Sequence, residues 1–343
     1  MSIKSILGRW VKNQIKLRVL KYKGSKAFWS WRYGFAPETI SVCQINKSNY
    51  KEFLNDRDYA LGHPWNGAYS HIIDSKLYLP LLFYRYPEYV PTYFYFKDES
   101  GFLPLDRKGI SRENVENFFD LLSREKKLCL KHTHSSVGQG FMLVEQQDDT
   151  FTLNGKSISK EDLRKLVDGL NEYIITAYVY QHDYAARICS TSLNTIRFLC
   201  AWDEEKREFF LARCFHRFGC NGNVVDNVGS GNGVLVFVDP ETGVCKSNGA
   251  INENKSGDRF VNHVVHPDHG IALEGMQIPC FREVKAKVLE IANTMSFLKW
   301  VGFDVAITKD GFKIIETNSL SSLIDQECEG YMQDKRLKRL FKK

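Results

Sequence analysis

The chain has 343 residues, 43% of them hydrophobic and 26% charged, which is ordinary for a globular protein with two or three packed subdomains. No window approaches eighteen uncharged apolar residues, and the basic N-terminus lacks the apolar core of a secretory signal, so we expect neither a membrane span nor a signal peptide. Nine scattered cysteines without a C-x-x-C pair favour reduced thiols and a cytoplasmic protein, with Cys129, Cys200 and Cys214 in the core.

The net charge of +6 comes from the two ends of the chain. Residues 1–32 hold nine Lys or Arg and no acid, residues 334–343 hold six against one Asp, and the body between is acidic. The body has no recognisable nucleic-acid-binding pattern, so we do not expect a nucleic-acid partner. Peripheral attachment of residues 1–32 and 335–343 to the anionic inner face of a membrane is one interpretation. The alternative is a helix packed on the body with solvated lysines.

Periodicity and turn residues predict an α+β protein with largely antiparallel sheets. Helices are expected over residues 2–23, 46–60, 111–126, 159–171 and 281–298. Strands are expected near 91–96 and over 128–131, 141–146, 173–180, 195–202, 208–215 and 233–238. The zinc interpretation of His263, His266 and His269 is disfavoured, because Pro267 breaks a helix there and the spacing suits a tetrahedral site poorly.

Lys131 ends a buried-looking strand and precedes a loop of small residues that contains Ser135, Ser136, Gly138 and Gly140. Small residues let backbone N–H groups wrap phosphate oxygens, while a nearby ammonium neutralises their charge. The loop matches neither a Walker A motif nor a dinucleotide fingerprint. From the loop alone, an ordinary flexible connection is the competing interpretation. Further along, Arg197 stands at the start of a strand, where it suits a phosphate or carboxylate, although surface salt bridging is the simpler alternative.

The segment WVGFDVAITKDGFKIIETNS, residues 300–319, predicts a hairpin around Lys309-Asp310-Gly311. With a three-residue loop and Gly311 at positive φ, Thr308 and Phe312 close the turn, Ala306 faces Ile314 and Asp304 faces Glu316. Asp304, Glu316 and Asn318 then share one face, and such oxygen ligands suit Mg²⁺. A two-residue loop would instead place Asp304 opposite Thr317. The competing interpretation leaves these acids incidental or at a solvated strand end.

The ordered motifs together resemble the ATP-grasp superfamily, and specifically the sugar-transfer-associated ATP-grasp family, over roughly residues 76–326. They are Lys131 with its loop to Gly140, Gln181-His182, Asn194-Thr195-x-Arg197, Arg217-x-Gly219, Val225-Asp226-Asn227 with glycines, His266-Pro267-Asp268, Gln277-Ile278-Pro279, Asp304 and Glu316-x-Asn318. The chain departs from the family in having His132 where proline is usual, Ala177 where the hinge usually has an acid, and a longer glycine run from Gly229 to Gly233.

The resemblance implies an ATP-grasp fold, in which two α+β lobes hold the nucleotide between antiparallel sheets. The boundaries it suggests are a basic helical extension at 1–75, a pre-ATP-grasp segment at 76–126, an N-lobe at 127–180, a C-lobe at 181–330 and a basic tail at 331–343. ATP would contact Lys131, Ser135, Ser136, Gly138, Gly140, Ile175, Thr176, Ala177, Tyr178, Val179 and Asn194. Mg²⁺ would bind Asp304, Glu316 and Asn318, and the catalytic residues would be Arg217, Arg197 and Lys131.

The function implied by the resemblance is an ADP-forming carboxylate–amine ligase that acts through an acyl phosphate. A carboxylated sugar or related lipid-linked glycan precursor, joined to an amino acid or amine, is the expected substrate. Two alternatives stay open at this point. One is a phosphotransferase that acts on a sugar hydroxyl from the same nucleotide site, and the other is a nucleotide-binding scaffold without turnover.

Overall fold

The structure, a computed structural model, describes residues 32–61, 63–106, 111–135, 138–228, 233–246, 249–252, 260–321, 323, 326 and 329–341. The expected helix at 2–23, the basic segment proposed to meet a membrane, Ser136, Gly229 and Gly231 lie outside these residues, apart from Arg32 at the end of that segment.

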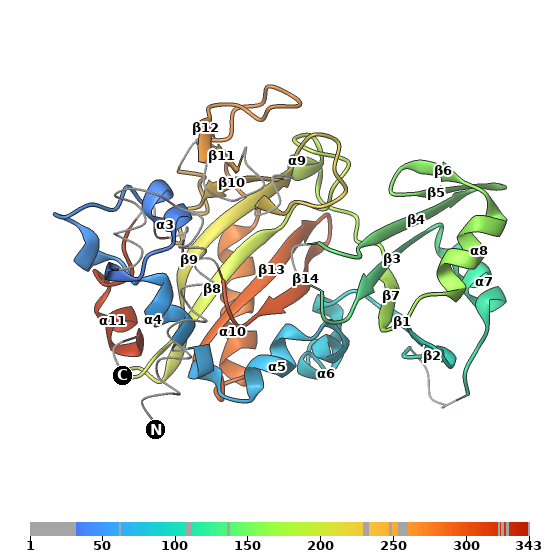
Figure 1. Cartoon of the computed structure of the whole chain (residues 1–343), viewed down its shortest axis with the longest axis horizontal. Helices are drawn as coiled ribbons and strands as arrows, with labels where there is room; N and C mark the ends of the chain where they lie inside the picture. Colours follow the sequence, from blue (N-terminus) through green and yellow to red (C-terminus); the bar gives the residue numbers. More distant parts are fainter. Residues whose placement is uncertain are drawn as a thin grey trace.

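Two antiparallel sheets form the framework, which confirms the α+β expectation (Figure 1). The first, sheet A, has the strand order β2-β1-β7-β3-β4-β5-β6, and the second, sheet B, has the order β12-β11-β10-β9-β8-β13-β14. Sheet A consists of β1 (Tyr93–Asp98), β2 (Gly101–Pro104), β3 (Lys127–His132), β4 (Met142–Gln147), β5 (Thr150–Leu153), β6 (Lys156–Ile158) and β7 (Tyr173–Ala177). Sheet B consists of β8 (Ile196–Asp203), β9 (Glu208–Gly219), β10 (Gly233–Phe237), β11 (Gly249–Asn252), β12 (Phe260–His263), β13 (Trp300–Thr308) and β14 (Gly311–Asn318).

One face of sheet A is covered by α7 (Val115–Glu125) and α8 (Lys160–Asp168). Helix α7 begins later than expected, because the side chain of Asn114 accepts a hydrogen bond from the backbone N–H of Glu116 and caps the helix there. Leu128 and Leu130 of β3 join the core under these helices. Because side chains alternate along a strand, Lys127, Cys129 and Lys131 lie on the opposite face, toward sheet B. Strands β1 and β2, from the segment expected to precede the N-lobe, belong to this same sheet.

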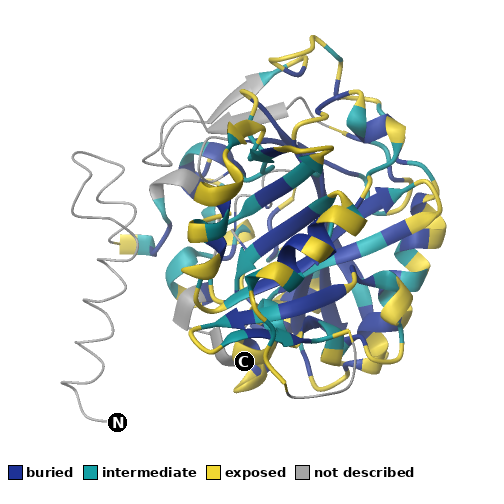
Figure 2. Cartoon of the chain, turned by 90° about the vertical axis from the view of Figure 1, so that its right-hand side faces the viewer, coloured by how far each residue is buried: buried dark blue, intermediate teal, exposed yellow. Residues whose placement is uncertain are grey.

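The largest core lies on one face of sheet B, under α10 (Phe281–Thr294) and the shorter helices α5 (Tyr69–Asp74), α6 (Leu79–Leu82) and α9 (Asp183–Ala186). The expected apolar stripe of α10 is confirmed, since Val284, Val288 and Ile291 are buried, although the helix ends at Thr294 rather than near 298. Figure 2 shows the strands of this lobe largely buried and the outer sides of the surrounding helices exposed.

The other face of sheet B is partly covered by α3 (Pro37–Val42), α4 (Asp56–Leu61) and α11 (Lys335–Phe341), with short turns η2 (Tyr50–Glu52), η3 (His63–Asn66), η4 (Lys76–Tyr78) and η5 (Pro87–Tyr89) elsewhere. The side chain of Asn66 bonds the backbone of Trp300, and Trp300 Nε1 donates to the Tyr59 hydroxyl. The part of the basic tail that forms α11 packs on the same face, because Leu337, Leu340 and Phe341 are buried in this core. The rest of the face stays polar and carries the candidate site.

The prediction of a continuous helix over 46–60 is wrong. Residues 46–49 form a turn in which Asn46 Oδ1 accepts from the N–H of Ser48 and Asn49 Oδ1 accepts from the N–H of Asn46. These side chains satisfy backbone groups that a helix would otherwise bond, so helical structure begins again only with η2 and α4.

Candidate functional site

The hairpin of β13 and β14 brings Asp304 opposite Glu316, as expected, but not through the expected turn. Thr308 pairs with Gly311, so the loop contains two residues, and Ala306 faces Lys313 instead of Ile314. Gly311 has the expected positive φ of 136°. A bulge at Ile315 lies between the pairs Asp304–Glu316 and Val305–Ile314. It shifts the pairing by one residue, and this shift places Asp304 opposite Glu316 in spite of the shorter loop. The two-residue alternative is right about the length of the loop but wrong about the pairing of Asp304, because Thr317 pairs with Phe303.

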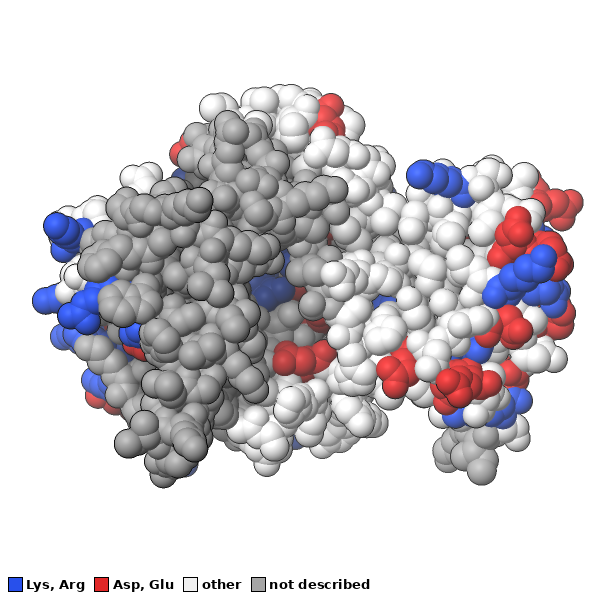
Figure 3. Space-filling model, in the orientation of Figure 1, with Lys and Arg blue, Asp and Glu red and all other residues white. Residues whose placement is uncertain are grey.

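Asp304, Glu316 and Asn318 consequently share the face of sheet B that also carries Arg197 from β8 and Arg217 from β9. This face is the uncovered part described above. Figure 3 shows a hollow near the centre of the molecule, with basic and acidic atoms inside it.

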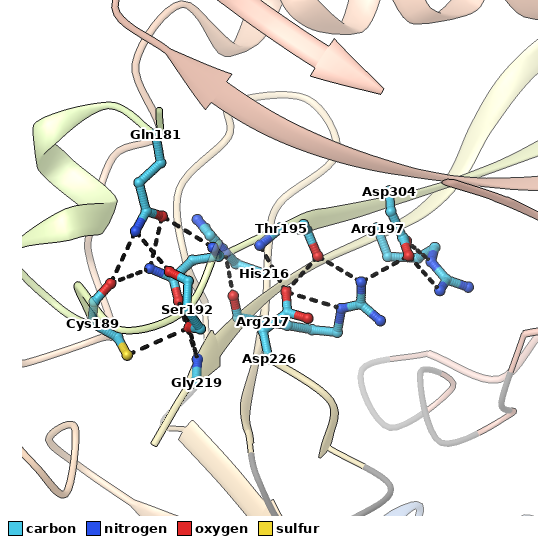
Figure 4. Close-up of polar contacts among 11 residues, drawn as sticks. Gln181, Cys189, Ser192, Thr195, Arg197, His216, Arg217, Gly219, Asp226 and Asp304 are labelled. Atoms are coloured by element: carbon cyan, nitrogen blue, oxygen red, sulfur yellow. Dashed lines mark hydrogen bonds and ion pairs between the residues drawn. The ribbon is translucent and has the colours of Figure 1, made fainter. Parts of the chain in front are cut away.

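Asp304 is held by both arginines. Arg197 donates to both of its carboxylate oxygens through Nε and Nη2, and Arg217 Nη2 lies 2.9 Å from Oδ2 (Figure 4). Burial alone would raise the pKa of Asp304, but the two guanidinium groups outweigh it and hold that pKa below its ordinary value. Arg197 also donates to the hydroxyl of Ser321 at 2.8 Å, so this guanidinium is engaged on both sides.

Arg217 extends the cluster toward the Val225-Asp226-Asn227 segment. Its Nη2 donates to the Thr195 hydroxyl at 2.5 Å, and its Nε lies 3.7 Å from Asp226 Oδ2 without forming a hydrogen bond. Burial would lower the pKa of Arg217, but Asp226 and Asp304 reverse the shift and raise it. Burial raises the pKa of Asp226, although Arg217 and Thr195 oppose the shift. Arg217 therefore stays charged and keeps buried donor capacity that no described residue uses.

Glu316 is paired with a lysine that the sequence analysis did not single out. Lys76 Nζ lies 3.4 Å from Glu316 Oε1 and donates to the backbone carbonyl of Ser135 at 2.6 Å. The preceding helix α5 is fixed to the same hairpin, because Asp74 accepts hydrogen bonds from Ser319 and Thr317 donates to the carbonyl of Ile73. The sequence shows a lysine at the start of the 76–126 segment, but it does not show that this lysine meets Glu316 and Ser135, because those contacts depend on long-range packing.

Lys131 points to the same region, because Glu316, Asp304 and Lys76 all act electrostatically on its ammonium group. Burial lowers the pKa of Lys131 from its ordinary value of 10.5, and Glu316 partly opposes this shift. Among the described residues, none forms an ion pair or hydrogen bond with the ammonium group of Lys131. With Lys131 protonated, four cations (Lys76, Lys131, Arg197 and Arg217) meet three anions (Asp226, Asp304 and Glu316), and the site has a net positive charge.

The loop after β3 reaches across to sheet B. Gly138 has a φ of +73°, and a Cβ there would lie 3.3 Å from the Val225 side chain, next to Asp226. Ser135 lies at the start of the loop, where its hydroxyl donates to the carbonyl of His132. Gly140, with a φ of +70°, packs against the Tyr173 hydroxyl. The structure thus brings the loop, Lys131 and the acid-bearing hairpin together.

The expected hinge runs from Ile175 to Val179 and passes from sheet A to sheet B. Alternation places Thr176 on the face that looks toward sheet B, whereas Ile175 belongs to the core under α7 and α8. The N–H of Ala177 donates to the carbonyl of Thr92, but no described residue accepts from the backbone N–H groups of residues 178–181. Tyr178 lies beside Lys127, whose ammonium is 5.2 Å from the ring centroid, and Val179 is buried.

Asn194 lies in a different environment from the other predicted nucleotide contacts. Its Nδ2 donates to Gln181 Oε1, Ala185 O and Cys189 O, and its Oδ1 accepts from Ser192 and from the N–H of Gly219. Every polar atom of this side chain therefore has protein partners, and Asn194 fixes the segment after the hinge. Figure 4 shows contacts around Gln181 and Ser192 and, next to them, the contacts that join Thr195 and Arg217 to Asp304.

The donor set of the hairpin suits a hard cation by ligand type, although the carboxylate of Asp304 is also bonded by Arg197 and Arg217. Its members offer two carboxylates and one amide, all oxygen ligands. The amide Nδ2 of Asn318 is buried and has no hydrogen-bond partner, which is unusual for a group that serves only the fold. Within the described ranges, no three His, Cys, Asp or Glu side chains form a metal-binding group, so the histidine segment offers no zinc site there. His266 instead bonds the carbonyl of Gly219.

In the part of the chain that the structure describes, no helix has the length and apolar character needed to cross a membrane. No curated protein matches the chain.

Several solved ATP-grasp enzymes are similar to this chain. The ligase PsnB in complex with its minimal precursor, Mg and ADP shares 10% identity at a TM-score of 0.39, over 81% of this chain and 62% of that one. D-alanine–D-alanine ligase from Bacillus anthracis shares 10% identity at 0.37, over 74% and 58% of the two chains. The ADP complex of N5-carboxyaminoimidazole ribonucleotide synthetase shares 11% identity at 0.40, over 77% and 48%. The chain thus spans less than two thirds of these proteins, and likeness at this level carries no argument about individual residues.

The family described as sugar-transfer associated ATP-grasp matches residues 69–339, which is most of the chain. This range includes both sheets, Lys76, Lys131, the two arginines and the hairpin acids. The chain therefore belongs to the sugar-transfer associated ATP-grasp family.

Proposed function

We propose that the protein is an ATP-dependent, ADP-forming ligase that joins a carboxylate to an amine through an acyl phosphate. Membership of the ATP-grasp family and the ligases among the similar structures support this class of reaction. The observation that carries the proposal is the Asp304–Glu316 pair, set on one sheet face among Lys76, Lys131, Arg197 and Arg217. Two acids that face each other can bind a metal ion, and the surrounding cations can bind the phosphate groups of a nucleotide that carries it.

Asp304, Glu316 and Asn318 would hold Mg²⁺, which supplies positive charge to the phosphates of ATP. Lys131 would bind phosphate oxygens, since its ammonium has no protein partner among the described residues. The N–H groups of the loop from 132 to 140, including Ser135, Gly138 and Gly140, would wrap the phosphates. The base would lie against the hinge from Ile175 to Val179, where the backbone N–H groups after Ala177 have no described backbone acceptor.

Arg217 would stabilise the charge that develops when the γ-phosphoryl group passes to the substrate carboxylate. Its guanidinium is held in place by Asp304, Thr195 and Asp226, yet its Nε forms no hydrogen bond. Preorganised donors of this kind are effective because they need no reorganisation during the reaction. Arg197 would act beside it, with less freedom, since it is bound to Asp304 and Ser321. Closure of the loop at Gly138 would keep water from the acyl phosphate until the amine attacks.

Hydroxylamine trapping tests the reaction. The purified protein is incubated with ATP, Mg²⁺, hydroxylamine and a panel of carboxylates that includes uronic acids and amino acids. The expected result is a hydroxamate formed in step with ADP when the correct carboxylate is present. A stable phosphorylated alcohol with no hydroxamate would replace the ligase proposal with a sugar phosphotransferase, and the absence of any ADP across the panel would favour a scaffold.

The finer substrate assignment is a carboxylated sugar or related, lipid-linked glycan precursor, joined to an amino acid or amine. The family description supports it through the words sugar-transfer associated. Comparing ADP release from uronic acids with release from non-sugar carboxylates, each with an amine, tests this assignment. Faster turnover of the non-sugar acids would overturn it.

Peripheral contact with an anionic membrane is a separate part of the proposal, and it rests on the basic ends of the sequence. The structure limits the contribution of the tail, because α11 turns its apolar side inward and Arg336 and Arg339 pair with Asp334 and Glu205. Sedimentation with anionic and neutral vesicles at low and physiological salt tests the contact. Equal recovery with both vesicle types would overturn it.

A further inference from the structure

Lys76 connects two parts of the proposed site, the hairpin acid Glu316 and the phosphate loop. Its ammonium group contacts Glu316 on β14 and the carbonyl of Ser135 in the phosphate loop, at 3.4 and 2.6 Å. Its own backbone N–H donates to the carbonyl of Thr133, so main chain and side chain both tie the segment after α5 to the loop. The side chain is 10% exposed, which leaves it little room to move without breaking one of these contacts.

The position of this ammonium bears on metal binding. A dication bound through Glu316 and a lysine ammonium within 3.4 Å of the same carboxylate would repel each other. Lys131 already acts on this region with a second positive charge. A metal ion at Glu316 would therefore compete with Lys76 for this carboxylate, and withdrawal of the lysine would relieve the repulsion. Withdrawal removes the donor that holds the Ser135 carbonyl.

We propose that Lys76 is a positioning residue that takes the place of the metal ion at Glu316 and holds the Ser135 end of the phosphate loop until metal binding displaces it. The inference rests on the proposed function, because it takes Glu316 to be a metal ligand. It goes further by linking two events that the function treats as separate, namely occupancy of the metal site and release of the loop. Displaced from Glu316, the ammonium would need a new anionic partner, so metal and nucleotide should bind more tightly together than separately.

The first part of the proposal, that Lys76 takes the place of the metal ion at Glu316, is tested by measuring Mn²⁺ affinity in the absence of nucleotide. Electron paramagnetic resonance reports the concentration of free Mn²⁺ in that titration. Lys76→Met keeps most of the unbranched side chain but removes the charge, and it should tighten Mn²⁺ binding about tenfold. Lys76→Arg should leave the affinity near that of the wild type. Lys285→Met is the matched control, because Lys285 also pairs with a glutamate, at 2.9 Å from Glu241, but lies on α10. It should leave the Mn²⁺ affinity unchanged.

Hydrogen exchange of the loop amides tests the second part, and its response to metal separates the proposed role from a purely structural one. In the wild type, Mn²⁺ alone should speed exchange in residues 132–135. In Lys76→Met, exchange should already be fast without metal and should not respond to it. Thermal unfolding of each variant checks that the fold is intact, and Lys76→Arg provides the comparison if the methionine variant does not fold.

The outcomes separate this inference from the proposed function. If Glu316→Gln binds Mn²⁺ as well as the wild type, the metal site is wrong and the inference fails with it. If Glu316→Gln weakens Mn²⁺ binding but Lys76→Met does not strengthen it, the metal site stands and the role of Lys76 is overturned. A Lys76→Met variant that loses ATP affinity with no change in Mn²⁺ affinity or loop exchange would also overturn it.

Discussion

Two adjoining sets of polar contacts, one around Gln181 and one around Asp304, differ in how fully their groups are satisfied (Figure 4). At the Gln181 end, every polar atom of Asn194 has a protein partner, and Ser192 and Gln181 are bonded in turn. At the Asp304 end, Arg217 Nε and Asn318 Nδ2 are buried without hydrogen bonds. The ammonium group of Lys131 has no ion pair or hydrogen bond with a described residue. Buried polar groups without partners are costly, so their presence beside Asp304 supports the proposed ligand site there.

The two sets of contacts also give different roles to residues of the Asn194-Thr195-x-Arg197 motif. Asn194 and Arg197 belong to one short motif, yet one stabilises the fold of the loop while the other faces the acid of the hairpin. A role in nucleotide contact for Asn194 stays a prediction, and its saturated amide makes an indirect role, through the position of the loop, the simpler one. Substitutions at the two ends should therefore separate stability from catalysis.

The largest effect is expected at Glu316. Glu316→Gln removes a charge from the proposed metal site and should lower turnover by about 10³-fold. The free energy of unfolding should change by less than about 1 kcal/mol, because the pair with Lys76 is partly exposed. Steady-state ADP release and urea denaturation measure the two quantities. Turnover within tenfold of the wild type would remove Glu316 from the site.

The next effect is expected for Lys131. Lys131→Ala should weaken ATP binding about 10–100-fold, which corresponds to the loss of one charge-assisted hydrogen bond. Lys127→Ala is the matched control, because Lys127 lies on the same face of β3 but already pairs with Glu145 at 2.5 Å. Isothermal titration with a non-hydrolysable ATP analogue compares them. Equal losses in both variants would mean that the absence of a protein partner does not mark the ligand-binding lysine.

A pair of identical substitutions tests the comparison most directly. Asn194→Ala leaves several buried groups without partners and should lower the free energy of unfolding by about 3 kcal/mol. Asn318→Ala removes an amide whose Nδ2 has no partner and should lower it by less than about 1 kcal/mol. The order should be the opposite for Mg²⁺ dependence: Asn318→Ala should need a higher Mg²⁺ concentration for half-maximal activity, whereas Asn194→Ala should change it less. Urea denaturation and a Mg²⁺ titration of activity measure both; a similar stability loss in the two variants would contradict the distinction.

The smallest effect is a pH dependence. Burial lowers the pKa of Lys131 below its ordinary 10.5, so the folded protein releases this proton before the unfolded chain does. As the pH rises through that window, ATP affinity should fall because the charge is lost. The contribution of this group to folding stability should rise, because the unfolded state then binds more protons. Lys131→Arg should lack both trends; titrations of ATP affinity and stability from neutral pH toward 10.5 check the signs.

Much of the framework was predictable from local sequence. Alternation and turn residues predicted the strands near 128–131, 195–202 and 208–215, because each depends on short-range patterning. The cores of α8 and α10 were predictable for the same reason, with their ends misplaced by a few residues. The helix expected over 46–60 failed because Asn46 and Asn49 bond their own backbone, a local competition that periodicity does not measure.

For the site, the sequence by itself determined that Glu316 and Asn318 share one sheet face, because side chains alternate with period two along a strand. It also predicted Asp304 opposite Glu316, although through a turn that the structure does not have. Only the tertiary structure decided how that register arises, through a two-residue loop and a bulge at Ile315. It also decided which groups are satisfied: Lys76 meets Glu316 from 240 residues away in sequence, and Asn194 is saturated by carbonyls of a neighbouring turn. Hydrogen bonds and ion pairs of that kind depend on where distant segments pack, and a one-dimensional pattern does not contain that information.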